Sequence, residues 1–142
     1  MTQDLQLTLM YEQGINLCGV TLTGGKQKVL PIEKLNDSEL EDMVQEDSLE
    51  SARLQIDGDL CIINLLAADG QWGRTIVWDY MQDRVIHLTN TPFVQDSVIQ
   101  DGKIRNRYEV AYWGHPADYW HSEEPLELCD PSYEPELIRD GE

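Results

Sequence analysis

Apolar and polar residues alternate with a period of two along the first quarter of the chain. The alternation runs over residues 5–10 and again over 15–21. Because successive side chains of a strand point to opposite faces of a sheet, this pattern predicts two strands, which we expect to pair as a hairpin. A third short extended piece is predicted over 29–32, and Pro31 confines it to an edge or an end of a sheet.

A helical period replaces the alternation in one part of the chain. Between Leu40 and Val44 the apolar residues recur at i, i+3 and i+4. Either Asn36 or Ser38 can cap the start, because each is followed three residues later by an acid. We therefore predict one short helix near residues 37–46. Its apolar stripe is narrow, so the helix is expected to lie on the surface of a sheet.

Strands joined by short turns are predicted through the middle of the chain. Asp57-Gly58 joins residues 53–56 to 59–62, and this pair is the signature of a type I′ hairpin turn, whose positive φ angles Gly and Asp tolerate best. Sequential strands with short turns usually pair as an antiparallel meander. Two further predicted hairpins join 74–80 to 84–89 and, through Asp101-Gly102, 94–100 to 103–113.

The alternation ends after Gly114, where four prolines stand among acids and aromatic residues. Such a segment is expected to form no continuous secondary structure beyond a turn of helix near 117–121. Its apolar side chains favour an irregular wrap over 114–138 around the body, because a free tail would leave them in water. We predict a single β-rich domain over 1–138 and a disordered tip over 139–142.

The predicted fold class is mainly β, with α+β at the margin. We expect an antiparallel meander that forms a small sandwich or a partly open barrel, with one short helix and an irregular acidic C-terminal segment. Strand order and oligomeric state are left open, because local pattern does not encode them.

Charge adds a functional constraint. The 142 residues include 27 acids and 10 bases, a formal net charge of −17, which argues against direct binding of nucleic acid or of an anionic membrane surface. A hydrophobic fraction of 41% is too high for a disordered acidic chain, and no apolar run is long enough to span a membrane. The charge is concentrated: residues 33–50 carry −7 and residues 118–142 carry −8, which leaves −2 for the other 99.

Two acidic segments on a nearly neutral body indicate a non-enzymatic protein that binds a basic protein partner, because complementary charge speeds and selects such encounters. An inhibitor or immunity-type protein, or one that mimics nucleic acid, has this outline. Exposed aromatic side chains beside the acids would suit a cationic surface. The candidate partner-binding residues are Glu39, Glu41, Asp42, Glu46, Asp47, Trp113, Tyr119, Trp120, Glu123 and Glu124.

The alternative hypothesis is a small metal-binding module or metal-assisted enzyme that uses residues 115–124. His115, Asp118 and His121 are ligand types for a divalent metal ion, and in a helical coil they would fall within an arc of about 120°. A further alternative is a β-domain that binds a sugar or another ligand through Trp113 and Trp120. The leading hypothesis needs no cofactor.

Three cysteines, Cys18, Cys61 and Cys129, form an odd set with no close spacing. They predict neither a disulfide framework nor a zinc knuckle, and they favour a reducing compartment. The first residues lack a basic region followed by an apolar stretch, so we expect a cytoplasmic protein. Cys18 and Cys61 fall within strand patterns and are expected to be small core residues.

Overall fold

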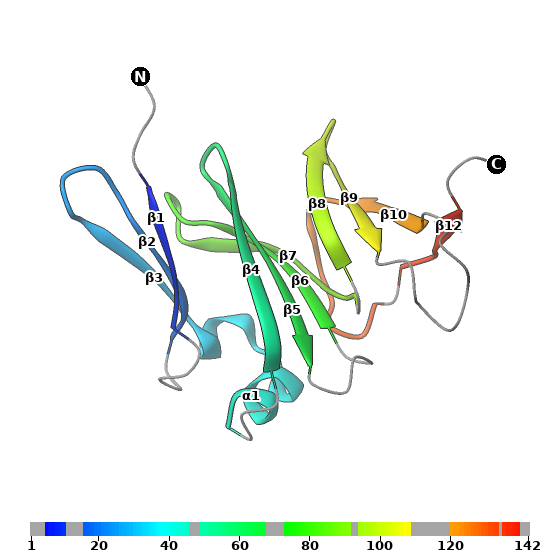
Figure 1. The fold of residues 1–142 in the computed structure, drawn as a ribbon, viewed down its shortest axis with the longest axis horizontal. Coiled ribbons are helices and arrows are strands. Elements are labelled where there is room, and N and C mark those ends of the chain that lie inside the picture. Colours follow the sequence, from blue (N-terminus) through cyan, green and yellow to red (C-terminus); the bar gives the residue numbers. More distant parts are fainter. Residues whose placement is uncertain are drawn as a thin grey trace.

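A computed structural model describes residues 5–10, 16–45, 49–67, 73–91, 94–108, 120–133 and 135–139. The described part is mainly β, as predicted, and its strands form three sheets that close no barrel. Figure 1 shows these sheets following one another along the long axis, with the five-stranded sheet in the middle. None of the described helices has the length and apolar content to cross a bilayer.

The N-terminal sheet has the order β1-β2-β3 and is antiparallel throughout. It contains β1 (Gln6–Leu9), β2 (Asn16–Thr21) and β3 (Gln27–Pro31). The predicted hairpin and the third short strand are therefore confirmed. Pro31 is the last residue of an edge strand, where its missing N–H interrupts no ladder.

Two helical elements follow, η2 (Ile32–Leu35) and α1 (Ser38–Gln45), so the short helix is confirmed. The expected caps are wrong. Asn36 ends η2 in the left-handed conformation, with a φ of 52°, and Ser38 is already the first helical residue. The residue between them, Asp37, caps the helix: its Oδ1 accepts the Leu40 N–H at 3.3 Å.

The central sheet has the order β11-β7-β6-β5-β4. The four long strands form the predicted meander, and β11 pairs in parallel with β7. The strands are β4 (Leu49–Asp57), β5 (Leu60–Ala67), β6 (Gly73–Asp79), β7 (Arg84–Asn90) and β11 (Leu128–Cys129).

The two Asp-Gly turns differ in geometry. Between β4 and β5 the two-residue loop is Gly58-Asp59, and only Gly58 has a positive φ, 61°. This is the pattern of a type II′ turn, so the predicted type I′ turn is wrong at this position. Asp101 and Gly102 form the type I′ pattern instead, with φ angles of 54° and 74°.

The C-terminal sheet has the order β12-β10-β9-β8. It contains β8 (Val94–Gln100), β9 (Lys103–Tyr108), β10 (Trp120–Pro125) and β12 (Ile138–Arg139). The expectation of an irregular C-terminal segment is therefore corrected at β10, β11 and β12. Trp120 and His121 lie in a strand rather than in the expected turn of helix, and Arg139 belongs to β12 rather than to a disordered tip.

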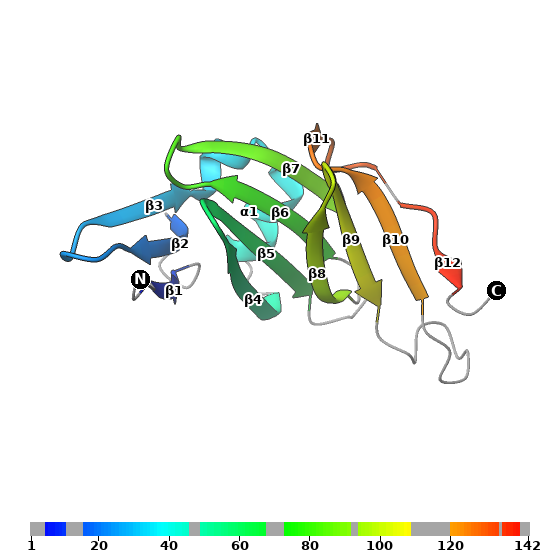
Figure 2. The same cartoon turned by 90° about the horizontal axis from the view of Figure 1, so that it is seen from above.

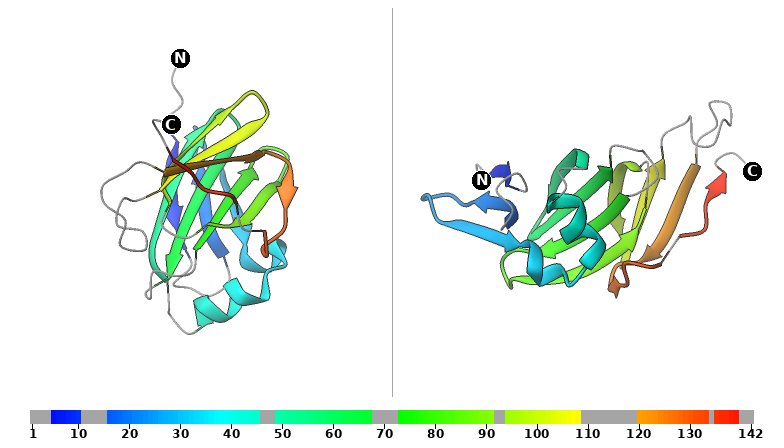
Figure 3. Two further views of the ribbon diagram at one scale, coloured as in Figure 1. Left: turned by 90° about the vertical axis from the view of Figure 1, so that its right-hand side faces the viewer. Right: turned by 90° about the horizontal axis from the view of Figure 1, so that it is seen from below.

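The central sheet is buried on both faces. On one face it packs against the N-terminal sheet, η2 and α1, with 15 buried residues in one apolar cluster. On the other face it meets the C-terminal sheet, where the described residues form a smaller buried cluster of Ile62, Val77 and Ile104, with half-buried Leu60, Ile86, Ile99 and Leu126 against it. Figure 2 shows the three sheets from above, and the right-hand view of Figure 3 shows η2 and α1 against the central sheet. Among the described residues, the second interface thus has fewer buried apolar side chains than the first.

Candidate functional site

The acidic face of η2 and α1 consists of Glu33, Glu39, Glu41 and Asp42. Glu33, Glu39 and Asp42 are exposed, and Glu41 is half-buried. The opposite side of these elements is buried through Ile32, Leu35 and Leu40. Charged side chains therefore project from elements whose apolar side is fixed in the core.

A buried ion pair fixes this helix to the central sheet. Arg74 Nε donates to Asp37 Oδ2 at 2.7 Å, and the two side chains are only 1% and 2% exposed. Arg74 Nη1 also donates to the Gly73 carbonyl and to Asn90 Oδ1, both at 3.0 Å. Nη2 reaches Glu39 Oε2 at 3.4 Å, although the Glu39 side chain remains 70% exposed. One predicted partner-binding acid therefore has an internal partner as well as exposed surface.

The other predicted partner-binding residues are dispersed. Trp120 lies half-buried in β10, and Glu123 is exposed on the same strand. Glu124 is 1% exposed and so presents no carboxylate at the surface, contrary to the prediction. Its side chain points inward because it alternates with Glu123 along the strand. Glu46, Asp47, Trp113 and Tyr119 lie outside the described residues.

The predicted metal ligands are not assembled within the described part. His121 lies half-buried on the extended strand β10, so the helical arc that would place it beside Asp118 is not present at this residue. His115 and Asp118 lie outside the described residues. Across the ranges that the structure describes, no group of three or more His, Cys, Asp or Glu side chains could hold a metal ion.

A polar seam, absent from the predictions, runs between the central and C-terminal sheets. Thr75 donates to Asn64 Oδ1 at 2.9 Å, and Asn64 Nδ2 donates to Ser97 Oγ at 3.1 Å. Ser97 donates to Asn106 Oδ1 at 2.6 Å, and Asn106 Nδ2 donates to Glu124 Oε1 at 3.3 Å. All five residues are buried, and the bond from Asn64 to Ser97 crosses from one sheet to the other.

Glu124 ends this chain of hydrogen bonds. Its Oε1 also accepts from Ser122 at 3.2 Å, whereas its Oε2 has no hydrogen-bond partner among the described residues. Burial raises the pKa of Glu124 to about 7, because removal from water penalises the carboxylate more than the hydrogen bonds from Ser122 and Asn106 stabilise it. The nearby charge of Glu123 raises this pKa further.

His87 lies in the same interface, fully buried on β7. Its Nδ1 lies 3.1 Å from the Leu126 carbonyl and must donate, so Nε2 accepts from the Thr89 hydroxyl at 3.1 Å. Burial lowers the pKa of His87, and the Leu126 carbonyl opposes this shift. The histidine is therefore held neutral, as one tautomer, close to neutral pH.

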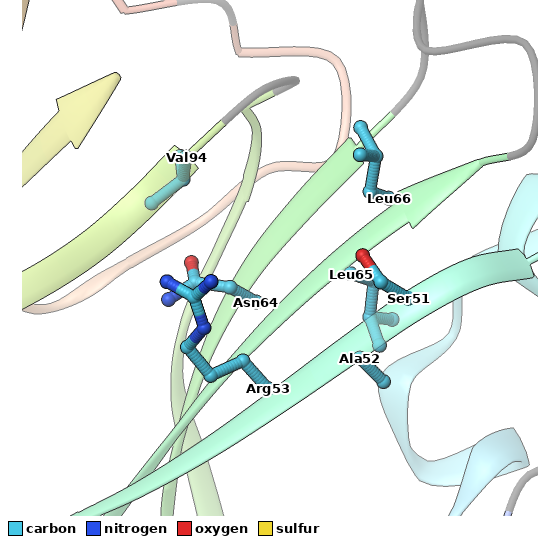
Figure 4. A pocket seen from close by; sticks show the side chains of 7 residues that line it. All are labelled: Ser51, Ala52, Arg53, Asn64, Leu65, Leu66 and Val94. Atoms are coloured by element: carbon cyan, nitrogen blue, oxygen red, sulfur yellow. The ribbon is translucent and has the colours of Figure 1, made fainter. Parts of the chain in front are cut away.

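A pocket opens beside the polar seam at the edge of the central sheet. It has a volume of about 250 Å³ and is lined by Ser51, Ala52, Arg53, Asn64, Leu65, Leu66 and Val94. Figure 4 shows Arg53 and Asn64 together on one side of it, with Val94 of β8 opposite. Arg53 and Asn64 are direct cross-strand partners, so their side chains share one face of the sheet. We call this the β4–β8 pocket.

Hydrophobic patterning could not reveal the seam or the pocket, because both depend on polar residues that the fold brings together. The available signal was the alternation in β9, where Ile104, Asn106 and Tyr108 are buried between exposed bases. A buried Asn in such a strand indicates a polar partner across the interface. No protein-family model, curated protein or solved structure matches the chain.

Proposed function

We propose that the protein is a non-enzymatic acidic binding protein that engages a basic protein surface through the acidic face of η2 and α1. An inhibitor or immunity-type protein, or a nucleic-acid mimic, would act in this way. The proposal includes a cytoplasmic location, supported by three cysteines that are all free thiols. It includes no direct contact with nucleic acid or membranes, because the net charge of −17 opposes both.

The anchoring of α1 is the observation that carries the proposal. The helix is capped by Asp37, and the same carboxylate is held by the buried Arg74, so the acidic face stands on an immobilised element. Carboxylates held in place before binding lose less conformational freedom when a partner arrives. Within the described part, no ion pair joins Glu33, Glu41 or Asp42 to a base, so these charges remain available.

A matched pair of double variants tests the proposal. Glu41→Gln/Asp42→Asn removes two charges from the acidic face, and Asp57→Asn/Asp59→Asn removes two exposed charges from the β4–β5 turn. Immobilised wild-type and variant proteins are exposed to cell extract at low ionic strength, and the retained proteins are compared. We expect one or more basic proteins to be retained by the wild type and the turn variant, and lost from the helix variant.

The affinity of a partner found in this way is then measured against salt concentration. Binding through the acidic face predicts a steep fall in affinity with salt and a shallower dependence for the helix variant. Equal loss of basic proteins from both double variants would indicate nonspecific attraction by total charge and would overturn the proposal. So would binding that does not change with salt.

A further inference from the structure

Arg53 differs from the other arginines in its surroundings. Arg74, Arg84 and Arg107 each form an ion pair, and Arg105 has an interaction as well. Among the arginines whose side chains the structure describes, Arg53 alone makes no ion pair or hydrogen bond to a described residue. In a chain with 27 acids, an exposed guanidinium that has no partner among the described residues, at the wall of a pocket, has its charge available for a ligand.

Asn64 supplies a second donor in the same pocket. It is 6% exposed, and its Oδ1 accepts from Thr75 at 2.9 Å, which orients the amide. Nδ2 uses one N–H for Ser97, and its second N–H makes no hydrogen bond to a described residue. Because Ser97 is itself held by Asn106, the amide is positioned by a supporting layer rather than by solvent.

The rest of the pocket wall is partly apolar. Leu66 of β5 and Val94 of β8 line it beside Ser51 of β4. The side chains of Ala52 and Leu65 alternate to the other face of the sheet, where they pack in the larger apolar cluster. The pocket volume of about 250 Å³ lies just below the roughly 300–1,000 Å³ of pockets for drug-sized molecules, which favours a smaller ligand. The pocket therefore offers N–H donors to a planar anionic group at one end and apolar surface to a short hydrocarbon chain at the other.

We propose that the β4–β8 pocket binds a small aliphatic carboxylate, with its carboxylate group on Arg53 and Asn64 and its alkyl chain against Leu66 and Val94. A guanidinium matches a carboxylate because two parallel N–H groups meet two oxygens in one plane. This site lies on β4, β5 and β8, away from the acidic face of η2 and α1, and it stands independently of the proposed protein partner.

The test is an NMR titration of the full chain with sodium butyrate, at constant ionic strength. 1-Butanol and butylamine are titrated alongside, because they carry the same alkyl chain with no charge or with the opposite charge. We expect saturable shifts at the Arg53 Nε–H, the Asn64 side-chain amide and the methyl groups of Leu66 and Val94. Butyrate should bind at least about tenfold more tightly than butanol or butylamine, the margin that charge-assisted bidentate bonds provide.

Three variants complete the experiment. Arg53→Gln should weaken butyrate binding about tenfold, whereas Arg84→Gln, which removes the same charge from an exposed site on β7, should change it less than about twofold. Ser51→Phe should abolish binding by filling the pocket. Retained amide dispersion shows that each variant is folded. The proposal is overturned if the shifts do not saturate or map elsewhere, if butanol binds as well as butyrate, or if Arg53→Gln binds like the wild type.

Discussion

Arg74 Nε donates to Asp37 Oδ2 at 2.7 Å in the interior of the protein, and this ion pair joins helix α1 to strand β6. Asp37 also caps the helix through its other carboxylate oxygen, so one side chain serves both local and tertiary structure. A buried ion pair is often no more stabilising than apolar side chains of the same volume, but removal of one partner leaves an uncompensated charge away from water.

Asp37→Asn is therefore expected to destabilise the protein strongly. The amide oxygen can still cap the helix, so the change tests mainly the loss of charge opposite Arg74. We expect the free energy of unfolding to fall by about 3–5 kcal/mol, as when one partner of a buried ion pair is removed. The measurement is equilibrium unfolding in urea.

The matched control is Asp42→Asn, because Asp42 is exposed on the same helix. It removes the same charge and should change the free energy of unfolding by less than about 0.5 kcal/mol. If both variants unfold at the same urea concentration, the ion pair between Asp37 and Arg74 does not anchor the helix.

Glu124 should make stability depend on pH. Its pKa is about 7 in the folded protein, against an ordinary value of 4.5. Between these values the folded chain holds a proton that the unfolded chain has released, so the free energy of unfolding falls as pH rises from 4.5 to 7 and stays low above that. A shift of this size corresponds to roughly 3 kcal/mol.

Glu124→Gln should remove this dependence, because an amide resembles the protonated carboxyl and does not titrate. Urea unfolding between pH 4 and 8.5 should show the variant more stable than the wild type at pH 8, with the advantage vanishing near pH 4. Glu123→Gln is the control, since Glu123 is exposed on the opposite face of β10. An unchanged pH dependence in Glu124→Gln would show that the buried carboxyl is not the titrating group.

Strand β10, which carries Glu123 and Glu124, shows how far the sequence could predict the fold. Alternation and turn residues identified the β4–β5 and β6–β7 hairpins and the short helix, because the positions that face the larger cluster are apolar. In β10 the inward positions are Ser122 and Glu124, so the hydrophobic pattern predicts no strand. What stabilises β10 is pairing with β9 and a set of hydrogen bonds to Asn106 and Tyr108. The two hydrogen bonds join residues 18 and 14 positions apart along the chain, and no local pattern specifies them.

The candidate sites were predictable to different degrees. The acidic segment that contains α1 was visible as a run of charge, but the division between exposed acids and the buried Asp37 depends on Arg74, 37 residues away. The β4–β8 pocket needed the pairing of Arg53 with Asn64 and the approach of Val94 from another sheet. Both relationships follow from strand order, which local pattern does not specify.

His87 is expected to titrate below its ordinary pKa of 6.5, because its burial disfavours the imidazolium. The signal of its ring Cε1–H, followed by NMR from pH 4 to 8, should show this, with the protein unfolded in urea as the reference. As pH rises, His87 loses its proton at a lower pH in the folded chain than in the unfolded chain. The neutral imidazole therefore stabilises the fold above pH 6.5, and this contribution is lost as pH falls. A midpoint at or above the unfolded value would contradict the buried neutral imidazole.

Thiol reactivity tests the packing of the N-terminal sheet against the central sheet. Cys18 on β2 and Cys61 on β5 are both fully buried in the larger apolar cluster, as expected from their strand patterns, whereas Cys129 is exposed. The pKa of Cys18 is raised by its hydrogen bond to Cys61 and by burial, so the reactive thiolate is suppressed. Ellman's reagent should therefore modify one thiol in the native protein and all three in urea.

Burial also raises the pKa of Cys129, so that thiol should react more slowly than a free cysteine. Cys129→Ser should reduce the native count to zero. Any fast-reacting thiol in this variant would mean that the two sheets separate readily, because Cys18 and Cys61 are buried between them.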